Sequence, residues 1–154
     1  MMSDSVLPLS MSVRKKTEEQ IASFSSRALR VLALAKKDTG GSIVFLGLAA
    51  MQDPPREEAK TAIRKCFGAG IRTVMITGDH KDTAAAVAAQ AGLLRNKKAV
   101  TGAELDRMSD SELDRRLDEF SVFARVNPSH KLRLVKAYKR KGHIVTMTGD
   151  GVND

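Results

Sequence analysis

The sequence has few aromatic side chains, a single cysteine and no long apolar run. Tryptophan is absent, and aromatic residues make up only 4% of the 154 residues. No apolar stretch approaches the roughly 20 residues of a membrane-spanning helix, and the N-terminus lacks a signal-peptide core. Cys66 cannot form an internal disulfide, which fits a reducing compartment, and its helical surroundings predict a buried packing residue.

The charge balance is basic but lacks the usual companions of nucleic-acid binding. Lys and Arg number 26 against 18 Asp and Glu, a net charge of +8, which favours polyphosphate, nucleotide or nucleic-acid partners. Nucleic-acid binding commonly interleaves basic with aromatic residues. The densest basic stretch, Lys131–His143, instead alternates with Leu132, Leu134, Val135 and Tyr138. This pattern predicts an amphipathic helix with a solvated basic face, and it disfavours nucleic acid.

The first third of the chain predicts a helix followed by a β-hairpin. An apolar content of 42% with 29% charged residues is typical of a globular protein. Arg14–Phe24 has the pattern of a polar helix. Two aliphatic runs, Ala28–Ala35 and Ser42–Met51, flank the sequence Lys-Asp-Thr-Gly-Gly at Lys37–Gly41. A Gly-Gly turn between two such runs is typical of a hairpin.

Near residue 52 the pattern changes to alternating helices and strands. Asp53, Pro54 and Pro55 predict the start of a helix, with Asp53 as its cap. The predicted helices are Arg56–Phe67, Lys81–Ala91, Glu104–Phe120 and Ser129–Lys141. The predicted strands are Ile71–Ile76, Val122–Ala124 and His143–Thr148. Such alternation predicts an α/β fold, a parallel sheet flanked by helices, with a domain boundary near residue 52.

Two of the predicted strands end in Thr-Gly-Asp. Thr77–Asp79 follows the first, and the denser segment Gly149–Asp154 follows the last. Active sites of open α/β sheets lie beyond the carboxyl ends of the strands, where a hydroxyl and backbone N–H groups can hold a phosphoryl oxygen. For Thr77–Asp79 an equally good interpretation is a turn in which Asp79 caps the next helix.

The second segment indicates a metal site. Asp150 and Asp154 lie four residues apart with Asn153 between them, and oxygen ligands on a flexible turn suit Mg²⁺. Lys131, near the start of a predicted helix, can reach a phosphoryl group as a point charge, or it is an ordinary surface lysine. The histidines show no metal-binding spacing: His80, His130 and His143.

Four motifs in order carry a resemblance to a known family. They are DPPR at Asp53–Arg56, ITGD at Ile76–Asp79, ARVNPSHK at Ala124–Lys131 and MTGDGVND at Met147–Asp154. Together they resemble the cytosolic catalytic part of P-type cation-transporting ATPases, of the type II group that includes calcium pumps. The resemblance implies a haloacid-dehalogenase-like Rossmannoid phosphorylation domain over residues 52–154. Residues 1–51 would be a small antiparallel hairpin and helix from the end of the nucleotide-binding domain.

The resemblance also implies roles for individual residues. Those that match phosphoryl-binding and catalytic positions are Thr77, Gly78, Lys131 and Asn153. Those that match the Mg²⁺ site are Asp150 and Asp154. Those that match ATP contacts are Arg30, Asp79 and Arg125. The implied cofactors are therefore Mg²⁺ and ATP, with the lysine neutralising the transferred phosphoryl group.

The sequence departs from the family because it contains no Asp-Lys-Thr-Gly-Thr nucleophile motif and no membrane helices. We therefore expect a piece of a pump on the cytoplasmic side of a membrane, inactive alone, whose partners are ATP and the remainder of the pump. Neither membrane contact nor nucleic acid is expected. Calcium is favoured as the transported ion by resemblance only. Without the central nucleophile strand, the strands Ile71–Ile76 and His143–Thr148 would have unpaired edges, which predicts self-association or marginal order.

Two alternatives stay open. A stand-alone phosphatase of the same superfamily needs its own aspartate nucleophile at a strand end, and the only candidates are Asp79 and Asp150. A non-catalytic module that binds Mg²⁺ and nucleotide would use the same residues without turnover.

Overall fold

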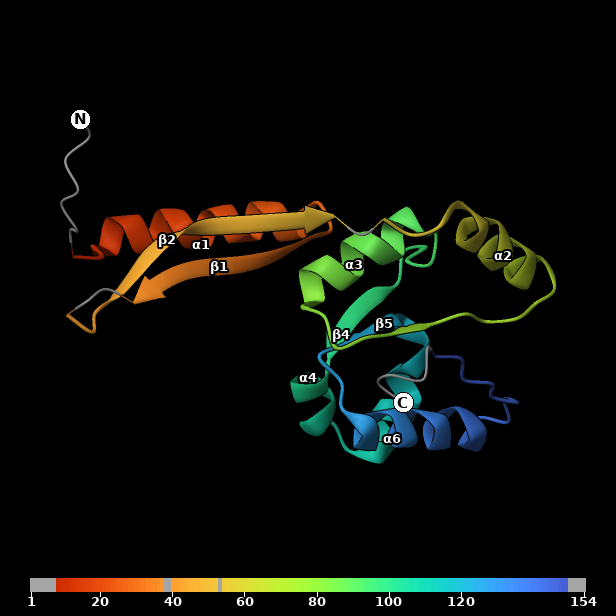
Figure 1. Cartoon of the computed structure of the whole chain (residues 1–154). Helices are drawn as coiled ribbons and strands as arrows, with labels where there is room; N and C mark the ends of the chain where they lie inside the picture. Colours follow the sequence, from red (N-terminus) through yellow and green to blue (C-terminus); the bar gives the residue numbers. More distant parts are fainter. Residues whose placement is uncertain (1–7, 38–39, 53, 150–154) are drawn as a thin grey trace. The chain divides into compact units, whose positions relative to one another are not determined.

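The chain divides into two compact units, with the boundary in the sequence between Pro54 and Pro55. The computed structural model describes residues 8–37, 40–52 and 54–149 (Figure 1). The first unit has a helix and a two-stranded antiparallel hairpin, and the second has a three-stranded parallel sheet with helices. The mixed α/β class predicted from the sequence is therefore confirmed.

In the first unit, helix α1 (Met11–Ser26) is followed by strands β1 (Leu29–Lys37) and β2 (Ile43–Gln52). The two strands pair antiparallel, from Leu29 opposite Gln52 to Lys37 opposite Ile43, so the predicted hairpin is confirmed. The helix is longer than predicted at both ends. At its start the Ser10 hydroxyl accepts a hydrogen bond from the Val13 N–H, which is a side-chain cap.

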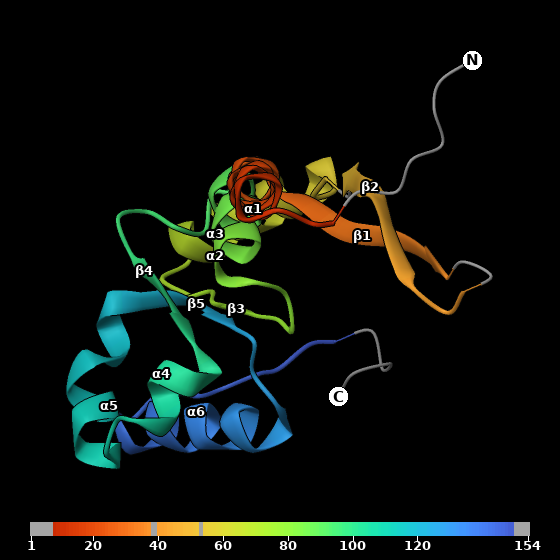
Figure 2. The same ribbon diagram turned by 90° about the vertical axis from the view of Figure 1, so that its left-hand side faces the viewer.

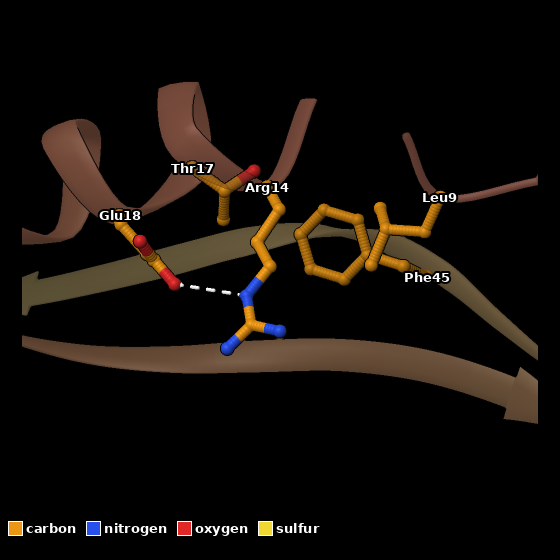
Figure 3. Close-up of a pocket in the computed structure, with 5 residues that line it drawn as sticks. All are labelled: Leu9, Arg14, Thr17, Glu18 and Phe45. Carbon is orange, nitrogen blue, oxygen red and sulfur yellow. Dashed lines mark hydrogen bonds and ion pairs between the residues drawn. The ribbon is translucent and has the colours of Figure 1, made fainter. Parts of the chain in front are cut away.

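Much apolar surface of the first unit stays exposed, because one helix cannot cover both faces of a hairpin. Among its described residues only Ser25 and Ala28 are buried. Its exposed large apolar residues are Leu9, Met11, Val13, Ile21, Leu32, Leu34, Ile43, Phe45, Leu46 and Met51. Figure 3 shows a pocket where α1 meets β2, lined by Leu9, Arg14, Thr17, Glu18 and Phe45. Within it the Arg14 guanidinium pairs with Glu18 at 3.0 Å.

The second unit contains a parallel sheet with the strand order β3-β5-β4. Its strands are β3 (Met75–Ile76), β4 (Lys98–Thr101) and β5 (Phe120–Ala124). Its helices are α2 (Glu57–Gly68), α3 (Lys81–Gln90), α4 (Gly102–Asp106), α5 (Asp110–Arg116), the 3₁₀ turn η1 (Leu117–Glu119) and α6 (Pro128–Arg140). The parallel sheet flanked by helices is as expected.

Strand β5 is the centre of this unit, and all five of its residues are buried. Alternation along β5 puts Phe123 on one face and Val122 and Ala124 on the other, and a register shift against β4 between Phe120 and Val122 brings Phe120 to the Phe123 face, so β5 contributes to two clusters. Phe120 and Phe123 pack with Leu105, Leu113, Leu117 and Leu134 from α4, α5, η1 and α6. Val122 and Ala124 pack against Ala84 and Ala88 of α3 on the other face. A strand buried on both faces is typical of parallel sheets.

The predicted strand Ile71–Ile76 is wrong for its first four residues. Only Met75–Ile76 pair with β5, and Ile71 is 57% exposed. The Arg72 guanidinium donates to the carbonyl oxygens of Leu117 and Phe120 at 2.9 and 3.0 Å and pairs with Asp118. These side-chain contacts hold the segment before β3 in place without a regular strand ladder.

The predicted strand His143–Thr148 is also wrong. Within the described part of the chain, residues 143–149 have no helix or strand and no pairing partner. Ile144 is fully exposed, Val145 packs against the main core cluster, and the His143 ring contacts Tyr138 with ring centroids 5.9 Å apart. A strand without a neighbour leaves its backbone groups to water, and that removes the reason for extended order.

Several smaller predictions are corrected. The single helix expected over Glu104–Phe120 is α4, α5 and η1, because Ser109 caps a new helix through a hydrogen bond from the Glu112 N–H. The sequence interpretation missed β4 altogether. Helix α2 begins at Glu57, after both prolines, with Arg56 as its N-cap residue, and Asp53 lies outside the described residues. Of the predicted packing residues, Cys66 is only half-buried and Leu132 is 57% exposed.

Candidate functional site

The loops that follow β3 and β5 meet at the carboxyl edge of the sheet. The Thr77 N–H donates to the Phe123 carbonyl at 2.9 Å, and the Val126 N–H donates to the Thr77 carbonyl at 3.3 Å. One step further, the Arg125 N–H donates to the Asp79 carbonyl at 3.1 Å. Backbone pairing therefore continues beyond the short strand β3 and fixes Thr77–Asp79 against the loop after β5.

Thr77–Asp79 also form a compact turn. The Thr77 hydroxyl lies 3.0 Å from an Asp79 carboxylate oxygen, to which it donates, and it accepts a hydrogen bond from the Asp79 N–H at 3.1 Å. The N-cap residue of α3 is His80, so the interpretation of Asp79 as the cap of that helix is wrong. Gly78 is exposed, and nothing lies within 4 Å of where its Cβ would be. The backbone at Gly78 is therefore open to close approach by a ligand.

The loop after β5 leads into α6 (Figure 2), and a capping box forms at the start of that helix. The Asn127 side chain accepts from the His130 N–H at 3.0 Å, and the His130 ring nitrogen Nδ1 accepts from the Asn127 N–H at 3.1 Å. Pro128 occupies the first turn, where its missing N–H costs nothing. Lys131 lies half-buried in the same turn, near the positive end of the helix.

Arg125 has an unusual backbone. Its φ is +51°, in the left-handed region that non-glycine residues rarely adopt, and its side chain is exposed. The hydrogen bonds of Arg125 and Val126 to the Thr77–Asp79 turn hold this conformation. Strained backbone positions cluster at functional sites, which is consistent with a site at this edge.

A buried histidine supports the loop. His130 is 6% exposed, and its Nε2 lies 2.8 Å from a carboxylate oxygen of Asp106. Since Nδ1 accepts from the backbone, Nε2 carries the proton and donates to Asp106. The sequence analysis found no metal-binding spacing for His130 and missed this supporting role. The signal was present in Asn-Pro-Ser-His, which places a histidine three residues after a helix cap.

An ion pair ties the start of α3 to α4. The Lys81 ammonium donates to the two Glu104 carboxylate oxygens at 2.8 and 3.0 Å. The same carboxylate accepts from the N–H and the hydroxyl of Thr101 at 2.7 and 2.8 Å. The Lys81 hydrogen bond first, and the Thr101 N–H second, lower the pKa of Glu104 from 4.5 to about 2. Sequence reasoning missed this pair, although Thr-x-x-Glu at Thr101–Glu104 is a capping-box signal.

The structure brings only some of the predicted site residues together. Thr77, Asp79 and Arg125 are linked by hydrogen bonds with Gly78 between the first two, and Lys131 lies in the first turn of α6, the helix that follows. Arg30 lies in β1 of the first unit, opposite Met51. The remaining predicted residues lie outside the described part of the chain: Asp150, Asn153 and Asp154. Within residues 8–37, 40–52 and 54–149, no three His, Cys, Asp or Glu side chains cluster as a metal site would require.

Comparison with known proteins identifies the family to which this fold belongs. Residues 11–154 match the family described as haloacid dehalogenase-like hydrolase, so the chain belongs to that family. It is 50% identical over 147 residues to calcium-transporting ATPase 1 of Bacillus cereus, a match that covers 88% of this chain and 17% of that protein.

Other relatives give the same result. The calcium-transporting ATPase lmo0841 of Listeria monocytogenes is 46% identical over 159 residues, covering 96% of this chain and 18% of that protein. The cation-transporting ATPase pma1 of Synechocystis is 44% identical over 155 residues, covering 92% and 17%. These matches confirm the resemblance to the haloacid-dehalogenase-like region of P-type calcium- and cation-transporting ATPases. The chain spans less than a fifth of the length of these relatives, and no helix in its described ranges is long and apolar enough to cross a bilayer.

Proposed function

We propose that this chain supplies the phosphoryl-binding site, and part of the ATP site, of a P-type pump that works through an aspartyl phosphate. One observation carries the proposal: the Thr77–Asp79 turn is hydrogen-bonded to Arg125 and Val126 in a chain homologous to calcium-transporting ATPases. The nucleophilic aspartate would come from another part of the pump, because the Asp-Lys-Thr-Gly-Thr motif does not occur in this sequence. Calcium transport and a location on the cytoplasmic side of a membrane belong to the same proposal.

The described side chains fit an anionic phosphoryl group. Thr77 offers a hydroxyl, Gly78 offers an accessible backbone N–H, and Lys131 offers an ammonium group at a helix start. Phosphoryl transfer depends mainly on positioning and on stabilising charge, and hydroxyl, N–H and ammonium donors provide both. In the unliganded chain the Thr77 hydroxyl donates its single proton to Asp79, so it would have to rotate away from that carboxylate to donate to a phosphoryl oxygen. Asp79, Arg125 and Arg30 would contact the nucleotide.

The metal part of the proposal rests on the sequence segment Gly149–Asp154. Asp150 and Asp154 would hold Mg²⁺, and Asn153 would bind phosphate. Mg²⁺, when bound, would neutralise charge on the phosphoryl oxygens. The carboxylates suit this ion because Mg²⁺ takes one or two of them together with water and phosphate.

Titration of the ¹⁵N-labelled chain with Mg²⁺ and a non-hydrolysable ATP analogue tests the proposal. We expect amide shifts at Thr77–Asp79 and Lys131 on addition of the analogue. Lys131→Ala should weaken binding of the analogue about tenfold and leave Mg²⁺ binding intact, because the lysine faces phosphoryl oxygens. Asp150→Asn should weaken Mg²⁺ binding first.

The matched control is Lys136→Ala, an exposed lysine on the same helix that should change neither affinity. Equal losses of Mg²⁺ affinity in the Lys131 and Asp150 variants would contradict the division of roles. Analogue binding without any shift at Thr77–Asp79 would refute the site itself.

A further inference from the structure

Helix α4 contacts both loops of the candidate site, although no motif of the sequence analysis included it. The helix directly follows strand β4, which pairs with the opposite edge of β5 from β3 (Figure 2). Three of its five residues make the contacts, at alternate positions: Gly102, Glu104 and Asp106.

Glu104 contacts the chain segment that follows β3. Its carboxylate binds Lys81, the first residue of α3 and only two positions after Asp79. The capping-box bonds from Thr101 fix the same carboxylate at its own end. Because both ends are anchored, the ion pair sets the distance between the start of α3 and the start of α4.

Asp106 contacts the chain segment that follows β5. Its carboxylate binds the Nε2–H of His130, whose Nδ1 accepts from the Asn127 N–H. His130 is buried and directly precedes Lys131. The orientation of the first turn of α6 is therefore fixed by a contact from α4.

Gly102 is the point of closest approach. A Cβ at this position would lie 2.5 Å from the carbonyl oxygen of Arg125 and 2.6 Å from Cε1 of the His130 ring. Both distances are shorter than any real contact, and one partner is backbone, so any side chain would displace the loop that carries Arg125. Glycine is required here by packing, because the backbone needs no positive φ.

The pairing of β3 leaves room for such support. The two residues of β3 and the hydrogen bonds of Thr77 and Asp79 attach the turn to β5 and its loop on one side only, so α4 supplies a second attachment from the other elements. We propose that α4 sets the spacing of the Thr77–Asp79 and Arg125–Lys131 loops, with Glu104, Asp106 and His130 as positioning residues. This inference rests on the proposed function, since it assigns α4 the alignment of that phosphoryl site.

Amide hydrogen exchange on the unliganded chain tests the inference directly. The amides of Thr77, Arg125, Val126 and Asn127 report the loop hydrogen bonds one by one. Gly102→Ala should lower the protection of the Arg125 and Asn127 amides about tenfold, since each loses its acceptor geometry. The matched control is Gly68→Ala in α2, where a Cβ meets nothing within 4 Å.

Further variants test the Glu104 contact and the Asp106 contact separately. Glu104→Gln keeps an amide oxygen for the Thr101 cap but loses the charge for Lys81, so protection should fall at Thr77 and Arg125 by about threefold. Glu112→Gln, which weakens the surface pair with Arg116, is its control. Asp106→Asn retains an acceptor for the His130 Nε2–H and should rescue the protection that Asp106→Ala loses at Asn127.

Affinity for inorganic phosphate with Mg²⁺ supplies the functional measurement. Gly102→Ala and Asp106→Ala should weaken it severalfold, while Asp106→Asn and Gly68→Ala should not. Unchanged protection at all four amides, or an equal fall across β5, would overturn the positioning role. If phosphate does not bind the unmodified chain, the proposed function fails, while the exchange pattern still decides the role of α4. If Gly102→Ala does not fold, the Asp106 and Glu104 variants decide it.

Discussion

Two segments of this chain have nearly the same sequence pattern and different structures. Val74–Asp79 reads Val-Met-Ile-Thr-Gly-Asp, and Val145–Asp150 reads Val-Thr-Met-Thr-Gly-Asp. In the first, Met75 and Ile76 pair with β5, and the tripeptide is hydrogen-bonded to the end of β5 and the loop that follows it. In the second, residues 145–149 have no strand partner within the described chain, and their side chains are largely exposed.

The comparison shows that an apolar run becomes a strand only when another strand is beside it. The first run passes next to β5, which is buried on both faces and offers backbone groups along one edge. The second run leaves α6 after Gly142, whose φ of +83° ends the helix, and within residues 145–149 Val145 packs against the core cluster. Local sequence alone gives a tendency to extend, and pairing provides the stability.

The largest expected effect concerns the two aspartates that end these segments. If neither Asp79 nor Asp150 is a nucleophile, the chain forms no phosphoenzyme from ATP, because loss of a covalent nucleophile costs orders of magnitude in rate. The measurement is incorporation of an acid-stable, hydroxylamine-sensitive label. A label that Asp79→Asn or Asp150→Asn abolishes would instead make this chain a phosphatase-like enzyme with its own nucleophile.

Hydrogen exchange should separate the two segments next. The amides of Thr77 and Val126 are bonded to the sheet, whereas no backbone hydrogen bond is found for residues 144–148 in the described structure. We expect at least about a hundredfold more protection in the first segment. Comparable protection in a monomer would mean that the second run pairs after all, and that the three-stranded sheet is incomplete.

A matched pair of alanine substitutions, one in each segment, should change the free energy of unfolding by different amounts. Ile76 packs against the main core cluster, so Ile76→Ala should lower the free energy of unfolding by about 2 kcal/mol. Met147, at the equivalent place in the second segment, is 46% exposed, so Met147→Ala should change it by less than about 0.5 kcal/mol. Urea unfolding measures both, with Ile144→Ala as an exposed control. Similar losses at 76 and 147 would show that both runs are packed.

The smallest expected effect is a dependence of stability on pH, caused by the Lys81–Glu104 ion pair that lies next to the first segment. The pKa of Glu104 is lowered from 4.5 to about 2, so its contribution to stability is complete above pH 4.5 and is lost as pH falls toward 2. The pair with Lys81 is partly exposed, so we expect about 1 kcal/mol after solvent screening. Unfolding at pH 5 and pH 3 should show this loss in the parent chain and not in Glu104→Gln, while Glu112→Gln should behave like the parent.

Strong periodicity and turn residues made much of the fold predictable. The hairpin followed from aliphatic runs around Gly-Gly, and α3 and α6 were predicted within two residues at each end. Strand β4 was missed because Lys98–Thr101 has only four residues and no long apolar run. The break at Ser109 was missed because its cap competes with a polar helical pattern that continues past it.

For the proposed phosphoryl site, the sequence determined which chemical groups are available. The residue types of Thr77, Gly78 and Lys131, and the carboxylates of Gly149–Asp154, follow from motifs whose donors and charges suit a phosphoryl group whatever the fold. Only the tertiary structure decided which of them meet. Arg125 reaches Asp79, and His130 reaches Asp106, because parallel neighbours in a sheet bring chain segments more than twenty residues apart to one edge. No local pattern encodes that contact, since hydrogen bonds across strands depend on which strand lies beside which.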